Sequence, residues 1–179
     1  MKLWRIATET RTCPASDLSG TGAAKNPGRW NDEGQAVVYC AATLAMAVLE
    51  TAAHVPTSGL PLNRFVICID IPEAIWAKRR VVTVSKLTTA WRAIPAGMAS
   101  VSVGSKWWTK NESAVLGVPS VIVPEESVCL INSRHADHAK ISCKVVRAFD
   151  FDALFRSQLK VVFYVQLLKT IRHLFWRSP

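Results

Sequence analysis

The sequence lacks features that would direct it out of the cell or into a membrane. No window is apolar enough for long enough to span a bilayer. The amino end, Met1–Ile6, holds two basic residues and no uninterrupted apolar stretch, which argues against a signal peptide. The five cysteines are an odd number, and none form a C-x-x-C pair. We therefore expect a reduced, cytoplasmic protein.

Several signatures of common enzymes are also missing. Gly20-Thr21-Gly22 is not followed by the third glycine of a dinucleotide fingerprint, and there is no P-loop. Ser120 does not lie in a G-x-S-x-G elbow, which argues against a serine-hydrolase nucleophile. We expect no metal site, because paired-ligand spacing is absent from the candidate ligands Cys129, His135, His138 and Cys143.

Acidic side chains are scarce: 13 Asp and Glu stand against 22 Lys and Arg, for a formal net charge of +9. Such a chain attracts polyanions, so nucleic acid, an acidic partner and an anionic substrate all remain open. The basic residues are scattered, and the tight run Lys78–Arg80 fits a solvated turn better than a nucleic-acid patch. The 179 residues, half of them hydrophobic, are enough for one globular domain with a core.

Strand-like runs outnumber helical patterns. Strands are expected at Leu3–Ala7, Ala36–Cys40, Arg64–Ile71, Arg80–Val84, Val118–Val123, Val128–Asn132 and Ser142–Phe149. A helix capped by Thr43 should run from Leu44 to about His54, where Pro56 closes it, and one or two helices should lie within Trp91–Leu116. This irregular order predicts an α+β fold, with a mixed or antiparallel sheet core and flanking helices.

Two segments differ from this pattern. Thr8–Asp32 is rich in Gly, Ser, Thr, Pro and Asn and is expected to be a long polar loop, a kind of segment that is often functional. After a short helical turn at Asp152–Arg156, apolar residues at helical spacing predict a basic amphipathic helix with a packing role. We expect one domain over residues 1–157 and a helical extension over residues 158–179.

Glu50 is the first candidate for chemistry. It is the only charged side chain between Glu33 and Arg64, and it belongs to a helix that is apolar on nearly every face. Such a helix is usually buried, and a buried carboxylate is costly unless it is paired or hydrogen-bonded. Glu50 is therefore a site residue, or it pairs with a basic neighbour or faces water on a narrow strip.

Four further positions suit a nucleotide-like ligand. In Gly28-Arg29-Trp30-Asn31 the arginine can fork two hydrogen bonds onto a phosphate, and the glycine permits close backbone approach. Tyr39 can stack on a flat heterocycle, and Ser120 can donate to a ribose or an amide. Asn132 adds a polar group after a strand. Taken singly, these residues also fit a surface arginine, a core tyrosine and a turn serine.

Four blocks, in this order, resemble the RES domain, a family named for its arginine, glutamate and serine. The blocks are Gly28-Arg29-Trp30-Asn31, Tyr39, Ala47-Val48-Leu49-Glu50 and Val118-Pro119-Ser120. The resemblance covers about Leu3 to Arg156. It implies a fold related to the core of ADP-ribosyltransferase toxins. It also implies a bacterial toxin that depletes NAD by phosphorolysis or hydrolysis, or modifies a protein, and a Xre-like DNA-binding antitoxin that plugs the active site.

The resemblance also implies roles for individual residues, with NAD as substrate and no metal. Arg29 would hold the phosphates, Tyr39 would pack on nicotinamide, and Glu50 would act at the ribose. Ser120 would orient the nicotinamide or ribose, and further cofactor-binding groups would be Trp30, Asn31 and Asn132. Many relatives have Asn-Pro-x-His where this chain has Asn132-Ser133-Arg134-His135, and the tail after Arg156 has no counterpart.

Other functions stay open at this point. A basic nucleic-acid-binding toxin directed at RNA would rest on charge alone, and its binding would fall steeply with salt. The chain could also be an inactive RES domain that serves only as a repressor partner. The presence of all four family residues, Arg29, Tyr39, Glu50 and Ser120, argues against this. The residues do not decide whether water, phosphate or a protein accepts the ADP-ribose, or whether the chain forms a homodimer.

Overall fold

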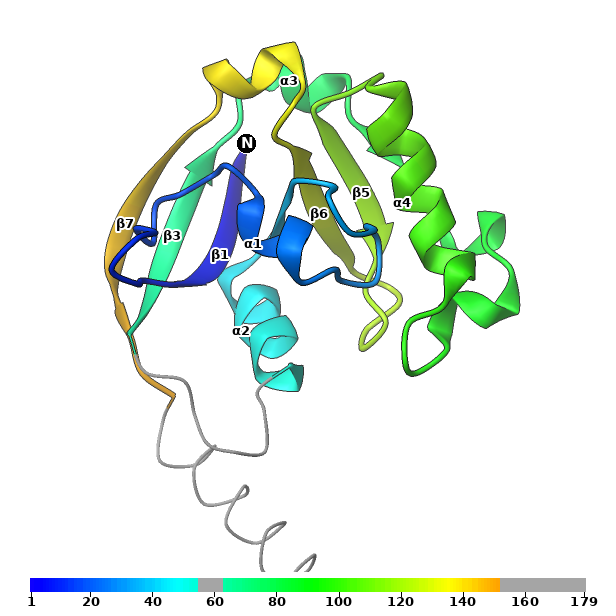
Figure 1. Cartoon of the computed structure of the whole chain (residues 1–179), viewed down its shortest axis with the longest axis horizontal. Helices are drawn as coiled ribbons and strands as arrows, with labels where there is room; N and C mark the ends of the chain where they lie inside the picture. Colours follow the sequence, from blue (N-terminus) through cyan, green and yellow to red (C-terminus); the bar gives the residue numbers. More distant parts are fainter. Residues whose placement is uncertain (55–62, 152–179) are drawn as a thin grey trace, which may run out of the picture.

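The computed structural model describes residues 1–54 and 63–151. Within them, seven strands form one sheet in the order β4-β5-β6-β2-β1-β3-β7 (Figure 1). The strands are β1 (Lys2–Thr8), β2 (Val37–Ala41), β3 (Arg64–Asp70), β4 (Arg80–Val81), β5 (Val115–Pro119), β6 (Ser127–Asn132) and β7 (Ser142–Phe149). Strands β4 and β5 pair in parallel, and the other neighbours pair antiparallel. The predicted α+β class with a mixed sheet is confirmed.

Short helices connect and cover the strands. They are α1 (Thr21–Lys25), α2 (Leu44–Ala53), α3 (Glu73–Ala77) and α4 (Met98–Lys110), with 3-10 turns η1 (Val84–Lys86), η2 (Thr89–Arg92) and η3 (Ala136–Lys140). The predicted cap of α2 is confirmed, because the Thr43 hydroxyl accepts a 3.2 Å hydrogen bond from the Met46 amide. Helix α2 packs against both β1 and β2.

Two predicted strands are wrong in their limits. The strand expected at Val118–Val123 is β5, which begins at Val115, inside the segment assigned to helices. Helix α4 ends early because Asn111 adopts a left-handed conformation, after which every residue of β5 is buried. Of the strand expected at Arg80–Val84, only the first two residues pair with β5.

Other segments differ as well. Helix α1 interrupts the predicted loop Thr8–Asp32, and helix α3 was not expected. Both have five residues, too few for a clear helical period in the sequence. The helical turn predicted at Asp152–Arg156 and the amphipathic helix predicted after it lie outside the described residues.

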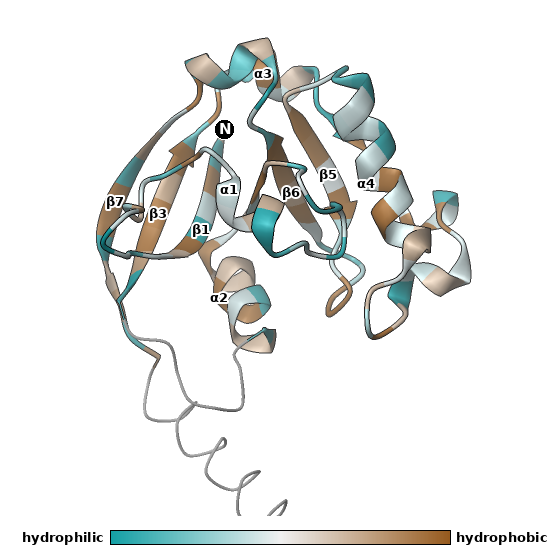
Figure 2. Cartoon of the chain, viewed as in Figure 1, coloured by the Kyte–Doolittle hydropathy of each residue, from teal (hydrophilic) through white to brown (hydrophobic). Residues whose placement is uncertain are grey.

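The sheet buries apolar side chains on both faces, as the hydrophobic colouring of β3, β5 and β6 indicates (Figure 2). One face carries a continuous core with Leu3, Ile67 and Ile131. The opposite face carries two separate clusters. Ile6 and Val66 pack with α2, whereas Trp30 packs with the apolar side chains of β5, β6 and α4. The sheet also has an opening, which the pocket occupies.

The opening lies between β1 and β2. Among the described residues these strands share one residue pair, Trp4 with Ala41, whereas β1 and β3 pair over seven positions. Continuing the antiparallel register would bring Arg5 opposite Cys40, yet the strands separate there. This separation leaves the unpaired edges of two central strands facing one another across a gap.

Candidate active site between β1, β2 and α2

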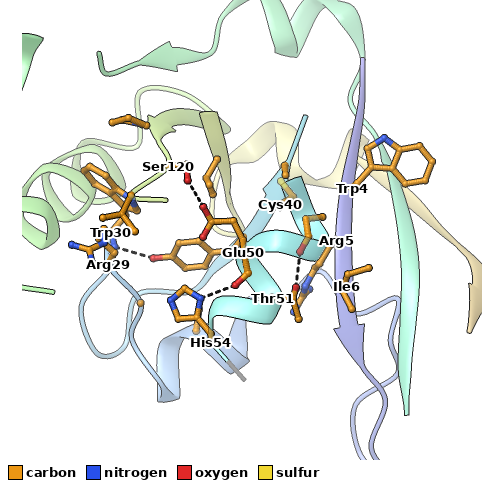
Figure 3. A pocket seen from close by; sticks show the side chains of 18 of the residues that line it. Trp4, Arg5, Ile6, Arg29, Trp30, Cys40, Glu50, Thr51, His54 and Ser120 are labelled. Carbon is orange, nitrogen blue, oxygen red and sulfur yellow. Dashed lines mark hydrogen bonds between the residues drawn. The ribbon is translucent and has the colours of Figure 1, made fainter. Parts of the chain in front are cut away.

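A pocket of about 320 Å³ occupies the gap between β1 and β2 (Figure 3). Its walls come from the unpaired parts of both strands, one side of α2, the loop around Arg29, and the turn after β5. The predicted site residues that line it are Arg29, Trp30, Tyr39, Glu50 and Ser120. The structure thus brings together residues separated by up to 91 positions in the chain, from Arg29 to Ser120.

Glu50 is held in place by Ser120. The Ser120 hydroxyl donates a 2.6 Å hydrogen bond to Glu50 Oε1, and this hydroxyl accepts 3.1 Å bonds from the amides of Ile122 and Val123. Because two backbone amides occupy its lone pairs, the serine proton is directed at the carboxylate. The serine is buried at 1% exposure, so the pair forms a fixed unit. Ser120 therefore orients Glu50, in addition to any contact with a ligand.

The expectation that the Glu50 helix is buried is wrong. Only Met46 and Ala47 of α2 are buried, and Glu50 is half-buried. The reason is that one side of α2 faces the pocket rather than packed protein. The carboxylate is therefore accessible from the cavity, as a group that contacts a ligand must be.

Arg29 is oriented by η2 and by the residue that follows it. Its Nη1 donates to the carbonyl oxygens of Trp91 at 2.7 Å and of Ala93 at 3.0 Å. Both bonds use Nη1, so Nε and Nη2 are the donors that the guanidinium can offer to a ligand. Burial lowers the pKa of Arg29, and the negative charge of Glu50 opposes this effect. The arginine remains charged, because its ordinary pKa is so high.

Tyr39 joins the pocket wall to the loop that carries Arg29. Its hydroxyl accepts a 3.0 Å bond from the Trp30 amide and donates a 2.9 Å bond to Asn31 Oδ1. Burial raises the pKa of Tyr39, so its hydroxyl stays protonated. A Cβ atom at Gly28 would lie 2.7 Å from the Tyr39 hydroxyl oxygen. The glycine was expected to admit a phosphate, and in the structure it admits this tyrosine.

Asn31 and Asn132, both predicted to bind the cofactor, are not among the residues that line the pocket. Asn31 is 1% exposed and bonds the Gly28 amide and the carbonyl of Ala23, which fixes the loop. Asn132 is fully buried and donates to Asn111 Oδ1 at 2.9 Å. Both amides therefore hold loops together in this structure.

The family loop from Asn132 to His135 is likewise occupied by local contacts. Ser133 donates to the Leu18 carbonyl at 3.1 Å, and the Arg134 guanidinium lies 4.5 Å from the centre of the Trp108 ring. His135 Nδ1 accepts the amide of Asp137 and so caps η3. These contacts give the loop a defined shape without a proline.

Sequence reasoning missed three charged or titratable residues of the pocket. Arg5 lies on β1, Arg64 begins β3, and His54 ends α2 with Nδ1 2.7 Å from the Glu50 carbonyl oxygen. Arg5 interrupts the otherwise apolar run Leu3–Ala7, which is the signal that could have drawn attention to it. Among the described lining residues, three arginines thus accompany one carboxylate. The pocket is suited to an anionic ligand.

Metal-binding groups and membrane-spanning helices are both absent from residues 1–54 and 63–151. These residues contain no group of three or more side chains arranged to hold a metal ion, and the expectation of a metal-free site remains a prediction. None of their helices combines the length and apolar character needed to cross a membrane.

The fold and pocket together define an α+β domain with a cationic cavity built around a single carboxylate. A sequence model of the RES domain matches residues 2–153. The chain therefore belongs to the RES domain family, as the resemblance of its residues indicated.

Known proteins similar to this chain agree with that assignment. It is 48% identical over 149 residues to the "Prs ADP-ribosylating toxin" of Sphingobium sp. (strain YBL2), covering 83% of this chain and 92% of that protein. It is 33% identical over 135 residues to the "Toxin Res" of Yersinia enterocolitica, covering 75% and 86%. A chain in the crystal structure of the M. tuberculosis MbcT–MbcA toxin–antitoxin complex has a similar fold, with TM-score 0.56 and 17% identity over 87% of each chain.

Proposed function

We propose that this protein is the toxin of a toxin–antitoxin pair and cleaves the nicotinamide–ribose bond of NAD. The observation that carries the proposal is the Glu50 carboxylate, held by Ser120 at 2.6 Å in a pocket whose other formal charges are arginines. The names of the relatives support both the class of protein and the use of NAD as substrate.

The chemistry requires one negative charge beside the ribose. When the C1′–N bond breaks, its electron pair neutralises the nicotinamide ring and leaves positive charge on the ribose, as in glycoside cleavage. A carboxylate that is already oriented stabilises this charge without reorganising. The leaving group departs neutral, so no general acid is needed. An acceptor oxygen then bonds to C1′ and releases its proton to solvent.

Arg29 is assigned to the diphosphate of NAD. Its Nη1 is committed to two backbone carbonyls, so the remaining edge of the guanidinium is presented in one orientation. Tyr39 lines the same pocket as Arg29 and Glu50 and is assigned to the nicotinamide ring. Binding energy from the diphosphate would thus be used to fix the reacting carbon beside the carboxylate.

Replacing Arg29 tests this clamp. We expect Arg29→Ala to raise the NAD concentration needed for half-maximal rate by about ten- to a hundredfold, the range for a lost charge-assisted hydrogen bond. Arg29→Lys should recover only part of the loss, because an ammonium cannot fork two bonds in one plane. Steady-state rates over a range of NAD concentrations measure both effects. A lysine variant equal to the parent would show that Arg29 is no bidentate clamp.

Toxicity is the cellular consequence of this activity. We expect induction of the protein alone in bacteria to stop growth, with cellular NAD falling before viability does. Glu50→Gln, produced to the same level, should leave both unchanged. A parallel time course of NAD content, growth and colony formation measures this. Growth arrest at constant NAD, or an equally toxic variant, would overturn the proposal.

An antitoxin partner fits the charge of the protein. The net charge of +9 would favour an acidic inhibitory segment, and insertion near Arg29 would compete with the diphosphate of NAD. A solved chain of similar fold comes from a toxin–antitoxin complex, which supports such a partner. We propose a Xre-like protein in this role.

A second candidate function is transfer of ADP-ribose to a protein. It is favoured by the name of the Sphingobium relative, which describes ADP-ribosylation of Prs. Cleavage and transfer share the first step and differ only in the acceptor. Incubation with NAD, with and without phosphate and with bacterial lysate, followed by identification of the ADP-ribose product, distinguishes water, phosphate and protein as acceptors.

A further inference from the structure

Two arginines of the pocket have no part in the proposed clamp. Arg5 lies at the first position where β1 and β2 separate, and Arg64 begins the neighbouring strand β3. Both line the same cavity as Glu50, and both side chains are half-buried. Figure 3 shows Arg5 and Arg29 flanking Glu50 from opposite sides. The pocket is therefore cationic at two separate places.

The hydrogen bonds of these arginines leave donors unused. Arg5 Nη1 donates to the main-chain carbonyl of Asp17 at 3.1 Å. Arg64 Nε is buried and has no hydrogen-bond partner among residues 1–54 and 63–151. A buried donor without an acceptor is costly and rare in folded proteins, and it needs an explanation. An anion in the cavity would supply the missing acceptor.

Charge leads to the same conclusion. Neither arginine forms an ion pair within the described ranges 1–54 and 63–151. Asp17 is the carboxylate whose charge acts on Arg5. Its oxygens accept hydrogen bonds from Ser19 and Cys13, and not from the Arg5 guanidinium. Burial lowers the pKa of Arg64, and the like charge of Arg5 lowers it further. Two arginines that line one pocket and form no ion pair among the described residues favour an anionic ligand there.

We propose that Arg5 and Arg64 form a second anion subsite, which binds a phosphoryl group on the side of Glu50 opposite Arg29. Arginine pairs match the geometry and the charge of phosphoryl oxygens. The phosphoryl group belongs either to NAD itself or to a separate phosphate-bearing molecule that accepts ADP-ribose. The proposal extends the proposed function, because it concerns what else the same cavity holds beside the scissile bond.

The test uses binding rather than turnover, with inorganic phosphate and ADP-ribose as probes. Calorimetric titrations compare the full-length parent with Arg64→Met and Arg64→Lys. Arg11→Met is the matched control, because Arg11 is exposed and does not line the pocket. We expect Arg64→Met to weaken phosphate binding about ten- to a hundredfold, the range for lost charge-assisted bonds, with Arg64→Lys intermediate. Arg11→Met should bind phosphate as the parent does.

The melting temperature without ligand separates a binding role from a structural one. Arg64→Met should melt at or above the parental temperature, because it removes an unsatisfied donor and a charge that the like charge of Arg5 opposes. If Arg64→Met does not fold, Arg64→Lys decides, and parental phosphate affinity in that variant overturns the subsite. A folded Arg64→Met protein that binds both probes like the parent overturns it as well, as does a parent that binds neither probe.

Competition identifies the source of the phosphoryl group. If ADP-ribose displaces phosphate and Arg64→Met weakens both, the subsite holds the diphosphate of the dinucleotide. If both probes bind at once, it holds a separate acceptor. The two proposals can also fail separately. If the parent does not consume NAD but Arg64→Met still loses phosphate binding, the proposed function is contradicted and the subsite stands.

Discussion

Glu50→Gln should fold like the parent and consume NAD at least about a hundredfold more slowly, the cost typical of losing one oriented electrostatic group. The glutamine oxygen can still accept the Ser120 hydroxyl, so the contact that positions the side chain is retained. What disappears is the negative charge beside the ribose. The loss should therefore fall on the maximal rate and leave the NAD concentration for half-maximal rate nearly unchanged.

Stability and a control variant complete this prediction. Melting should be unchanged or slightly higher, because Glu50 lies in the C-terminal half of α2, where a negative charge opposes the helix dipole. Glu33→Gln, at an exposed position outside the pocket, should keep full activity. A folded Glu50→Gln protein with parental turnover would remove Glu50 from the mechanism.

Gly104→Ala should destabilise the protein by about 1–3 kcal/mol, the usual cost of overpacking a filled interior. Gly104 is buried in α4, where the helix lies directly against the main chain of Trp30. An added Cβ would lie 2.7 Å from the Trp30 carbonyl carbon and closer still to its oxygen. These are backbone atoms, so no side-chain rotation relieves the clash. The gain in helix propensity, about 1 kcal/mol, is too small to compensate.

Urea denaturation of the parent, Gly104→Ala and Gly22→Ala measures this effect. Gly22 is the matched control, because it is helical and a Cβ there meets nothing within 4 Å. Gly22→Ala should be as stable as the parent or slightly more so. Since Trp30 adjoins Arg29, Gly104→Ala should also weaken NAD binding. Equal denaturation midpoints for all three proteins would show that α4 can move away from the Arg29 loop at little cost.

The parts of the fold that were predictable depend on local signals. The threonine cap marks the start of α2, and alternating or continuous apolar runs mark β1, β3, β6 and β7. The boundary between α4 and β5 was misplaced, because Val115–Pro119 is apolar in either structure and the left-handed turn at Asn111 carries no glycine. Local propensity cannot decide between a buried helix and a buried strand there.

The site was predictable only in part, for a related reason. Arg29, Tyr39, Glu50 and Ser120 belong to blocks with recognisable neighbours, and all four line the pocket. Arg5 and Arg64 carry no such motif, and their place in one pocket depends on strand order and on the separation of β1 from β2. Asn31 and Asn132 attract attention as polar residues, but burial and hydrogen bonding assign them to loop structure here.

The central claim is that this pocket breaks the nicotinamide–ribose bond, and nicotinamide release tests it most directly. The purified parent and Glu50→Gln are each incubated with NAD, and both NAD and free nicotinamide are quantified by chromatography over time. The account predicts that the parent releases one nicotinamide for each NAD lost, whereas Glu50→Gln releases almost none. Intact NAD with the parent, or loss of NAD without an equal release of nicotinamide, would contradict it.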